Sequence, residues 1–363
     1  MNKGGIKKYK MAWDKRLGQY DIRTKLLDHM ESFLTLKKGG RPFPVSAEIH
    51  VTNNCNHRCN FCEARHFLRE NRQQLKTDLV KIIIRDLKEH GIKGIVWSGG
   101  GEPLVHSDFF EILDFSFSKR IDNGLITNFS IIKPENIPPL IDQLSWIRIS
   151  FNGGNRETYH KIHGINHFDK VIENIKILSE ENIIKGNKLP ISISMVYTKD
   201  NFDSILDLVN TAILLNIHSL HIRPDQFITD LKWLKSDKVR DKLKAAAELP
   251  KNMESSLQLS TSEYMEKQYL KKYPQTCYAH FFTLSITADG YVNFCKSRFD
   301  RTETDYGNCN TSSINDIWYG DKVKKIEKMI KPCECAGFCR QMHVNVYVDD
   351  IITIPEELMT NFI

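Results

Sequence analysis

The sequence predicts an α/β protein whose main part is a partial (β/α)6 TIM-like barrel, followed by a smaller cysteine-rich domain. Strand-like apolar segments are followed by segments of helical spacing, and this pattern recurs six times within residues 46–225. Strands that alternate with helices form a parallel sheet with right-handed crossovers. Six units instead of eight leave such a barrel open on one side. Six of the nine cysteines follow residue 274, which separates the second domain from the first.

The elements follow one another in a regular order. The expected strands cover 47–51, 94–97, 125–127, 146–150, 191–197 and 220–223, and the expected helices cover 77–90, 108–119, 134–144, 168–181 and 202–215. Residues 1–45 form a basic extension with an amphipathic helix expected at 22–36, and 46–225 form the barrel. We expect a helical linker at 226–273, broken at Leu249-Pro250, the second domain at 274–340, and a tail at 341–363 with a strand at Val344–Val348.

Composition and charge exclude several classes of protein. Apolar residues make up 41% and charged residues 26% of the chain, no apolar run is long enough to cross a bilayer, and Met1–Lys10 lacks the apolar core of a secretory signal. We therefore expect a cytoplasmic protein without a membrane partner. Residues 1–41 hold eleven Lys/Arg and four Asp/Glu. We interpret them as a solvated arm, with a docking segment for an anionic partner as the alternative. A nucleic-acid partner is not expected, because no broad basic face with interleaved aromatics is present.

Three cysteines follow the first expected strand with metal-ligand spacing. Cys55, Cys59 and Cys62 are separated by three and then two residues. One short loop with this spacing can place three thiolates around a four-iron cluster and leave the fourth iron open for a substrate or cofactor. A zinc loop or three unrelated buried cysteines are the alternatives for this segment taken alone.

Polar residues and glycines stand where later strands end. Gly100, Gly101 and Glu102 follow the second expected strand, and glycines allow the backbone to approach a ligand closely. Four polar residues stand at the ends of the third and fourth strands, Thr127, Asn128, Ser150 and Asn152, and Arg223 ends the sixth. Because chemistry in such barrels lies at the carboxyl ends of the strands, these side chains are candidates for one binding site. Ordinary capping by Thr, Ser and Asn, and a structural ion pair for Arg223, are the alternatives.

These motifs together resemble those of the radical S-adenosylmethionine (radical SAM) enzymes. The resemblance rests on Cys55-x3-Cys59-x2-Cys62 with the aromatic Phe61, and on Gly100-Gly101-Glu102-Pro103. It implies a [4Fe-4S] cluster on the three cysteines and SAM chelated to the open iron. It also implies that Glu102 and its glycines bind the SAM amino group, and that the strand-end residues bind its ribose and carboxylate. An external one-electron donor of the flavodoxin or ferredoxin type is the implied protein partner.

The second domain resembles the SPASM/twitch extension of these enzymes. Cys277-x12-Gly290-x4-Cys295 precedes Gly307-Asn308-Cys309, Ser313-Ile314-Asn315-Asp316-Ile317-Trp318 and Cys333-x-Cys335-x3-Cys339. A turn at Ala288-Asp289-Gly290 would form a hairpin that brings Cys277 and Cys295 together. The full pattern has seven cysteines for two auxiliary clusters, but only six follow the barrel here. We therefore expect one auxiliary [4Fe-4S] cluster on Cys277, Cys295 and two of Cys333, Cys335 and Cys339, with Cys335 and Cys339 the first choice. Zinc on the same thiolates is the alternative.

Cys309 is then left without a cluster. We favour a small buried hydrophobic role for it, and a hydrogen-atom donor to a substrate radical is the alternative.

The predicted activity is reductive cleavage of SAM and hydrogen abstraction from a small polar substrate of the sugar, aminoglycoside or nucleoside type, giving dehydrogenation or epimerisation. The absence of a peptide-recognition module favours a small molecule. Modification of a ribosomal peptide is the alternative enzyme function, and a zinc-binding scaffold is the alternative without catalysis. A molybdopterin-type cyclase is not expected, because Asn361-Phe362-Ile363 does not match its terminal Gly-Gly.

Overall fold

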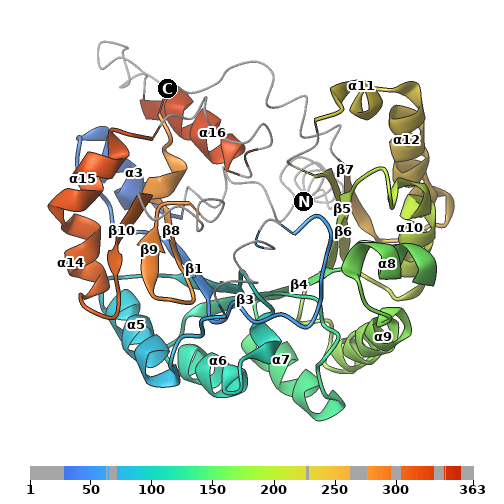
Figure 1. Ribbon diagram of the computed structural model, residues 1–363, viewed down its shortest axis with the longest axis horizontal. Helices are drawn as coiled ribbons and strands as arrows, with labels where there is room; N and C mark the ends of the chain where they lie inside the picture. The colour runs from blue at the N-terminus through green and yellow to red at the C-terminus, as the bar shows by residue number, and fades with distance from the viewer. Residues whose placement is uncertain are drawn as a thin grey trace, which may run out of the picture.

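One curved sheet organises the whole protein. The computed structural model describes residues 28–62, 64, 72–225, 229–261, 276–295, 304–330, 339 and 341–352. Its ten strands run in the order β10-β9-β8-β1-β2-β3-β4-β5-β6-β7. The sheet curves into an open arc, and the helices of the barrel lie along its outer side (Figure 1).

The six predicted β/α units are confirmed. The parallel strands are β1 (Ser46–His50), β2 (Gly94–Ser98), β3 (Asp122–Thr127), β4 (Trp146–Ser150), β5 (Ile191–Tyr197) and β6 (Ser219–Pro224). The helices between them are α5 (Thr77–Glu89), η1 (Pro103–Val105), α6 (Phe109–Ser118), η2 (Pro134–Asn136), α7 (Ile137–Gln143), α8 (Arg156–His163), α9 (Phe168–Ile184), η3 (Phe202–Ser204) and α10 (Ile205–Leu214). In α5 the buried positions Val80, Ile83, Ile84 and Leu87 share one helical face, which packs toward the sheet.

Helix α8 was not predicted, although its boundaries are marked in the sequence. Asn155 caps its first turn in a capping box with Thr158, and Gly164 ends it in the left-handed conformation with φ +65°. The helix is only eight residues long and begins six residues after the end of β4. Its last residue, His163, is buried.

The segment expected to be a helical linker contributes a strand to the sheet. After α11 (Leu231–Leu234) and α12 (Asp237–Asn252), the chain forms β7 (Gln258–Thr261), which pairs in parallel with β6. Pro250 lies within α12 and does not break it; the helix ends two residues later. The expected linker is therefore part of the barrel as far as Thr261.

The second domain extends the same sheet at its other edge. Strand β8 (Thr283–Ile286) pairs in parallel with β1, and β9 (Tyr291–Asn293) and β10 (Asp305–Asn308) continue as antiparallel neighbours. The expected hairpin joins β8 to β9, with Gly290 at φ +89°. Helices α14 (Ile314–Tyr319) and α15 (Asp321–Glu327) lie over this edge (Figure 1).

Both ends of the described chain pack on the second domain. Helix α3 (Met30–Lys37), η4 (Ala279–Phe281) and α16 (Met342–Ile352) share a small apolar cluster that includes Phe33, Phe282, Val344 and Val348. The prediction of a strand at Val344–Val348 is wrong, because these residues lie within helix α16. Val344, Val346 and Val348 alternate, but Val344 and Val348 are buried four residues apart and Val346 is only half-buried, as on a helix face. No described helix has both the length and the apolar character needed to span a lipid bilayer.

The main apolar core continues from the barrel into the second domain. Trp318 of α14 is fully buried, and its indole N–H donates to the carbonyl of Pro42 at 2.9 Å. The Arg41 guanidinium lies 3.9 Å from the Trp318 ring centroid. Trp318 thus fastens the second domain to the segment that leads into β1.

Replacing Trp318 with Ala is expected to lower the free energy of unfolding by about 3–5 kcal/mol, because a large buried aromatic side chain is lost. Since the sheet is continuous, barrel and second domain should still unfold in one transition. Urea denaturation followed by circular dichroism measures both. Tyr319→Ala, next to it on the same helix and 46% exposed, is the matched control and should change the free energy little. Two separate transitions in the unaltered protein would contradict this account.

Candidate active site

The loop that carries the first three cysteines is closed by short backbone pairing. It follows β1, and its two arms are joined by an antiparallel bridge between Thr52 and Gln74, with Leu75 N–H donating to Val51 O at 2.9 Å. Residues 63 and 65–71 of this loop lie outside the described part. Cys55 is exposed, and Cys59, Phe61 and Cys62 are half-buried. Cys62 N–H donates to Cys59 O at 3.4 Å, and burial, followed by the charges of Cys62 and Cys55, raises the pKa of the Cys59 thiol.

The glycine-rich turn after β2 is built against this loop. Gly101 N–H donates to Thr52 O at 3.1 Å, and Glu102 N–H donates to Asn54 O at 2.8 Å. A Cβ at Gly101 would lie 2.1 Å from Asn54 O. The glycines were expected to let the backbone approach a ligand closely. At Gly101 the backbone instead approaches the cysteine loop.

Glu102 is the buried carboxyl group of this site. It is 3% exposed, and its oxygens accept hydrogen bonds from Asn128 N at 2.7 Å, Thr127 Oγ1 at 2.5 Å and Leu104 N at 3.2 Å. Burial raises the pKa of Glu102 to about 7, although these hydrogen bonds oppose the shift. A carboxyl group held in this way is a fixed acceptor for a cationic ligand near neutral pH.

The polar residues at the ends of β3 and β4 mostly hold the scaffold together. The Asn128 amide donates to Asn56 Oδ1 of the cysteine loop at 2.8 Å. The Asn152 side chain accepts from Val196 N at 2.7 Å and so joins the end of β4 to β5. Ser150 ends β4 half-exposed, and Arg223 lies opposite Val196 in the β5–β6 register. Thr127 and Asn128 therefore contribute to the site indirectly, by hydrogen bonds to Glu102 and, from Asn128, to the cysteine loop.

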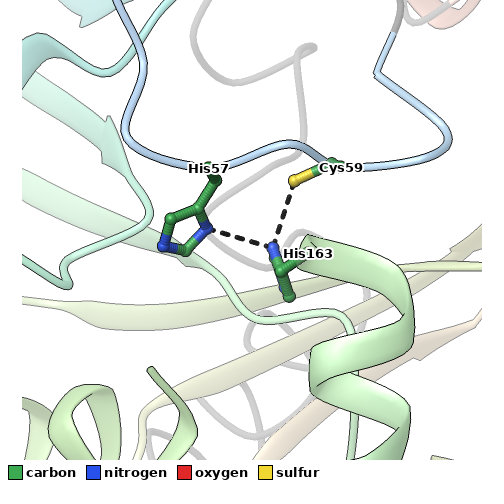
Figure 2. A group of neighbouring side chains, drawn as sticks. All are labelled: His57, Cys59 and His163. Carbon is green, nitrogen blue, oxygen red and sulfur yellow. Dashed lines mark hydrogen bonds between the residues drawn. The ribbon is translucent and has the colours of Figure 1, made fainter. Parts of the chain in front are cut away.

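Two buried histidines adjoin Cys59. His57 is in the cysteine loop and His163 at the end of α8; His163 Nδ1 lies 3.2 Å from Cys59 Sγ and 3.3 Å from His57 Nδ1 (Figure 2). Burial lowers the pKa of His57 to about 4 and that of His163 well below its usual value, so both rings are neutral near pH 7. The position of His57 between Cys55 and Cys59 could have drawn attention to it. No sequence spacing links His163 to the loop.

The residues present fit an iron–sulfur cluster on the cysteine loop. One loop carries all three thiols, and beside Cys59 lies Tyr159, whose fully buried hydroxyl has no hydrogen-bond partner among the described residues. Burial, followed by the charges of Cys59 and Glu102, raises the pKa of Tyr159, which places the phenol near both groups. Thiolates are costly at such a position without a metal to offset their charge.

Two cysteines of the second domain act on the same buried phenol. Burial raises the pKa of Tyr306, and the Cys277 and Cys295 thiols both raise it further, so both lie near the same phenol. Cys339 is half-buried, whereas Cys333 and Cys335 lie outside the described residues.

Cys309 lies elsewhere. It follows β10 and lines a pocket of about 560 Å³ together with Asp86 of α5, His90 directly after that helix, and the loop that precedes α14. None of the residues that surround Glu102 lines this pocket. The geometry therefore does not support Cys309 as a hydrogen-atom donor in the barrel.

Replacing Gly101 with Ala is expected to displace the cysteine loop, because a Cβ cannot fit against Asn54 O. We expect most of the iron bound by the first three cysteines to be lost after anaerobic reconstitution, measured by iron and sulfide analysis. Gly94→Ala is the matched control, since its Cβ would meet Asp122 at an ordinary 3.6 Å. Full iron content in Gly101→Ala would show that the turn and the loop are not coupled.

Comparison with known proteins agrees with this geometry. Residues 49–212 match the radical SAM superfamily, and residues 277–341 match the SPASM iron-sulfur cluster-binding domain. Together the two matches cover more than half of the chain.

Relatives differ in how much of their length they share with this chain. A probable GTP 3′,8-cyclase of Sulfurisphaera tokodaii is 24% identical over 83% of this chain and 94% of its own length. An S-adenosylmethionine-dependent nucleotide dehydratase of Selenomonas ruminantium is 27% identical over 44% of this chain, and the match spans only 59% of that protein.

Solved structures share the fold. Streptococcus suis SuiB bound to S-adenosylmethionine superposes with a TM-score of 0.64 at 21% identity, over 95% of this chain and 84% of SuiB. The two domains imply a SAM-binding [4Fe-4S] cluster and an auxiliary iron–sulfur cluster. The protein belongs to the radical SAM enzyme superfamily and carries a SPASM-type domain at its C-terminal side.

Proposed function

We propose that this enzyme binds SAM beside the cysteine loop and abstracts a hydrogen atom from a small polar substrate of the nucleoside or sugar type. The observation that carries the proposal is the buried Glu102, fixed by three hydrogen bonds next to the loop of Cys55, Cys59 and Cys62. A [4Fe-4S] cluster on these cysteines would supply the electron that splits SAM into methionine and a 5′-deoxyadenosyl radical.

The chain's own residues orient the cofactor. The Glu102 carboxylate accepts hydrogen bonds from the SAM ammonium group. The Thr127 hydroxyl and the Asn128 backbone N–H keep the Glu102 carboxylate in place, because each donates to one of its two oxygens. Because Glu102 N–H is bonded to the cysteine loop, the acceptor for the ammonium group and the cluster ligands keep a fixed spacing. Ser150 and Arg223, near the ends of their strands, are proposed to face the rest of SAM or the substrate.

The substrate class is supported by the relatives. The names of two of them specify a GTP cyclase and a nucleotide dehydratase. Dehydrogenation fits the structure better than epimerisation, because Cys309, the thiol considered as a hydrogen-atom donor, lies against α5. Dehydrogenation needs an acceptor for the second electron, and Cys277 and Cys295, with two of the cysteines at 333, 335 and 339, would hold the cluster that provides it. An external flavodoxin or ferredoxin would supply the first electron.

Replacing Cys55, Cys59 and Cys62 with Ala is expected to halve the iron content, from about eight to about four per chain, and to abolish 5′-deoxyadenosine formation with dithionite. Iron analysis and chromatography of the products measure both. Cys309→Ala should keep both at the level of the unaltered protein. Zinc in place of iron, with no cleavage of SAM, would overturn the proposal in favour of a scaffold.

The substrate class can be tested with deuterium. Nucleosides or sugars deuterated at ring carbons should transfer deuterium to 5′-deoxyadenosine, which mass spectrometry detects. Transfer only from a deuterated peptide would move the assignment to peptide modification.

SAM affinity should depend on pH through Glu102. The pKa of about 7 means that below pH 7 the carboxyl group must lose its proton before it can accept an ammonium ion. Affinity should rise about tenfold per pH unit up to about pH 7 and then level off. The raised pKa affects folding in the opposite direction to SAM binding. Without SAM, the folded protein holds the Glu102 proton more tightly than the unfolded chain, so the free energy of unfolding falls as pH rises from about 4.5 to about 7.

Calorimetry of SAM binding to the reconstituted protein, in buffers of different ionisation enthalpy, measures the affinity and the proton released. Glu102→Gln should bind SAM at least tenfold more weakly, with the step near pH 7 removed. If the affinity of Glu102→Gln for SAM showed a step of equal size near pH 7, the titrating group would be a residue other than Glu102.

A further inference from the structure

A chain of hydrogen bonds connects Glu102 to Cys59 through the two buried histidines. Asn128, whose backbone N–H donates to Glu102, accepts from Ser130 Oγ at 2.8 Å through its Oδ1. Ser130 Oγ lies 3.1 Å from His57 Nε2, and His57 Nδ1 lies 3.3 Å from His163 Nδ1. Each hydroxyl or neutral imidazole has a limited number of protons, so the partners fix which atoms donate.

The Ser130 hydroxyl determines the tautomer of His57. Its one proton goes to Asn128 Oδ1, and it accepts from Asn56 Nδ2 at 2.7 Å. It is therefore left with one lone pair for His57, so His57 Nε2 carries the proton and His57 Nδ1 is an acceptor.

The tautomer of His163 follows from the backbone. The N–H of Asn152 donates to His163 Nε2 at 3.0 Å, so this nitrogen has a lone pair and the proton of the neutral ring is on Nδ1. That N–H has two acceptors in reach, Cys59 Sγ at 3.2 Å and His57 Nδ1 at 3.3 Å.

This arrangement argues against a separate metal site. One ligand atom each of His57, Cys59 and His163 lies within 4.8 Å of the other two, as in a metal centre. A metal on His163 Nδ1 would need a lone pair there, but the hydrogen bond from Asn152 already uses the only lone pair of the neutral ring.

The end of α8 also holds the cysteine loop on both sides of Cys59. Arg58 N–H donates to His163 O at 2.9 Å, and Asn60 N–H donates to Ile162 O at 3.0 Å. The Tyr159 ring packs on the His163 imidazole with centroids 4.2 Å apart. The imidazole is therefore positioned relative to Cys59 by the backbone and by packing, independently of its own hydrogen bonds.

We propose that His163 is a positioning residue that donates its Nδ1–H to the Cys59 thiolate and raises the reduction potential of the cluster held there. This rests on the proposed function, in which Cys59 is a cluster ligand. A hydrogen bond to a cluster sulfur places the positive end of a dipole next to the electron added on reduction, and so favours the reduced state. His57 competes for the same proton and weakens the bond to sulfur.

The test measures the midpoint potential of the first cluster by electron paramagnetic resonance in a redox titration of the full-length protein. His163→Phe should shift the potential to more negative values. His163→Asn, whose amide N–H can take the place of Nδ1–H, should return the potential most of the way to that of the unaltered protein. Protein labelled with 15N-histidine should show a nitrogen coupling to the reduced cluster that disappears in His163→Phe. An unchanged potential in His163→Phe with a complete cluster would overturn the proposal.

His57→Phe provides the variant of opposite sign. It removes the competing acceptor, so the Nδ1–H of His163 is left to Cys59 and the potential should move to more positive values. If His163→Phe does not assemble a cluster, His57→Phe still tests the proposal. An unchanged or more negative potential in His57→Phe would overturn it. Failure of the proposed function gives a different pattern, because the unaltered protein would then show no cluster signal from Cys55, Cys59 and Cys62.

Discussion

The site depends on two backbone hydrogen bonds between the glycine-rich turn and the cysteine loop. Gly101 and Glu102 donate to the carbonyls of Thr52 and Asn54, so the loop is held by the end of the neighbouring strand. The turn can come this close only because residue 101 has no side chain. The distance between the thiols and the Glu102 carboxyl group is thereby set by the sheet and not by the loop alone.

A second set of backbone contacts holds the loop from the opposite side. The last carbonyls of α8 accept from the residues on either side of Cys59, and Asn152 joins the start of this segment to β5. A loop that must hold a metal cluster cannot rely on its own short sequence for rigidity. Here the ends of β2, β3 and β4 all contribute to it, which fits the general rule that binding loops are positioned by a rigid scaffold.

Burial gives the site its electrostatic character. The His57 and His163 rings are neutral near pH 7, and Glu102 is close to half-ionised. The site in the free protein therefore carries little charge of its own, and bound charged groups would change the protonation of its residues. The second domain continues the sheet through β8, so its cysteines are attached to the same scaffold as β1 and the loop that follows it.

The six β/α units, the cysteine loop, the glycine-rich turn and the hairpin at Gly290 could be predicted from the residues alone, because each has a local signature of periodicity, spacing or turn chemistry. The remaining features follow from how distant segments pack against one another. Strand β7 was missed because Gln258–Thr261 has only one apolar residue, and helix α16 was misassigned because its valines alternate as in a strand; in both segments the packing of the surrounding chain selects the structure. The position of Cys309 against α5, and of His163 beside Cys59 across more than one hundred residues, depends on how the strands order in space, and no local pattern encodes that order.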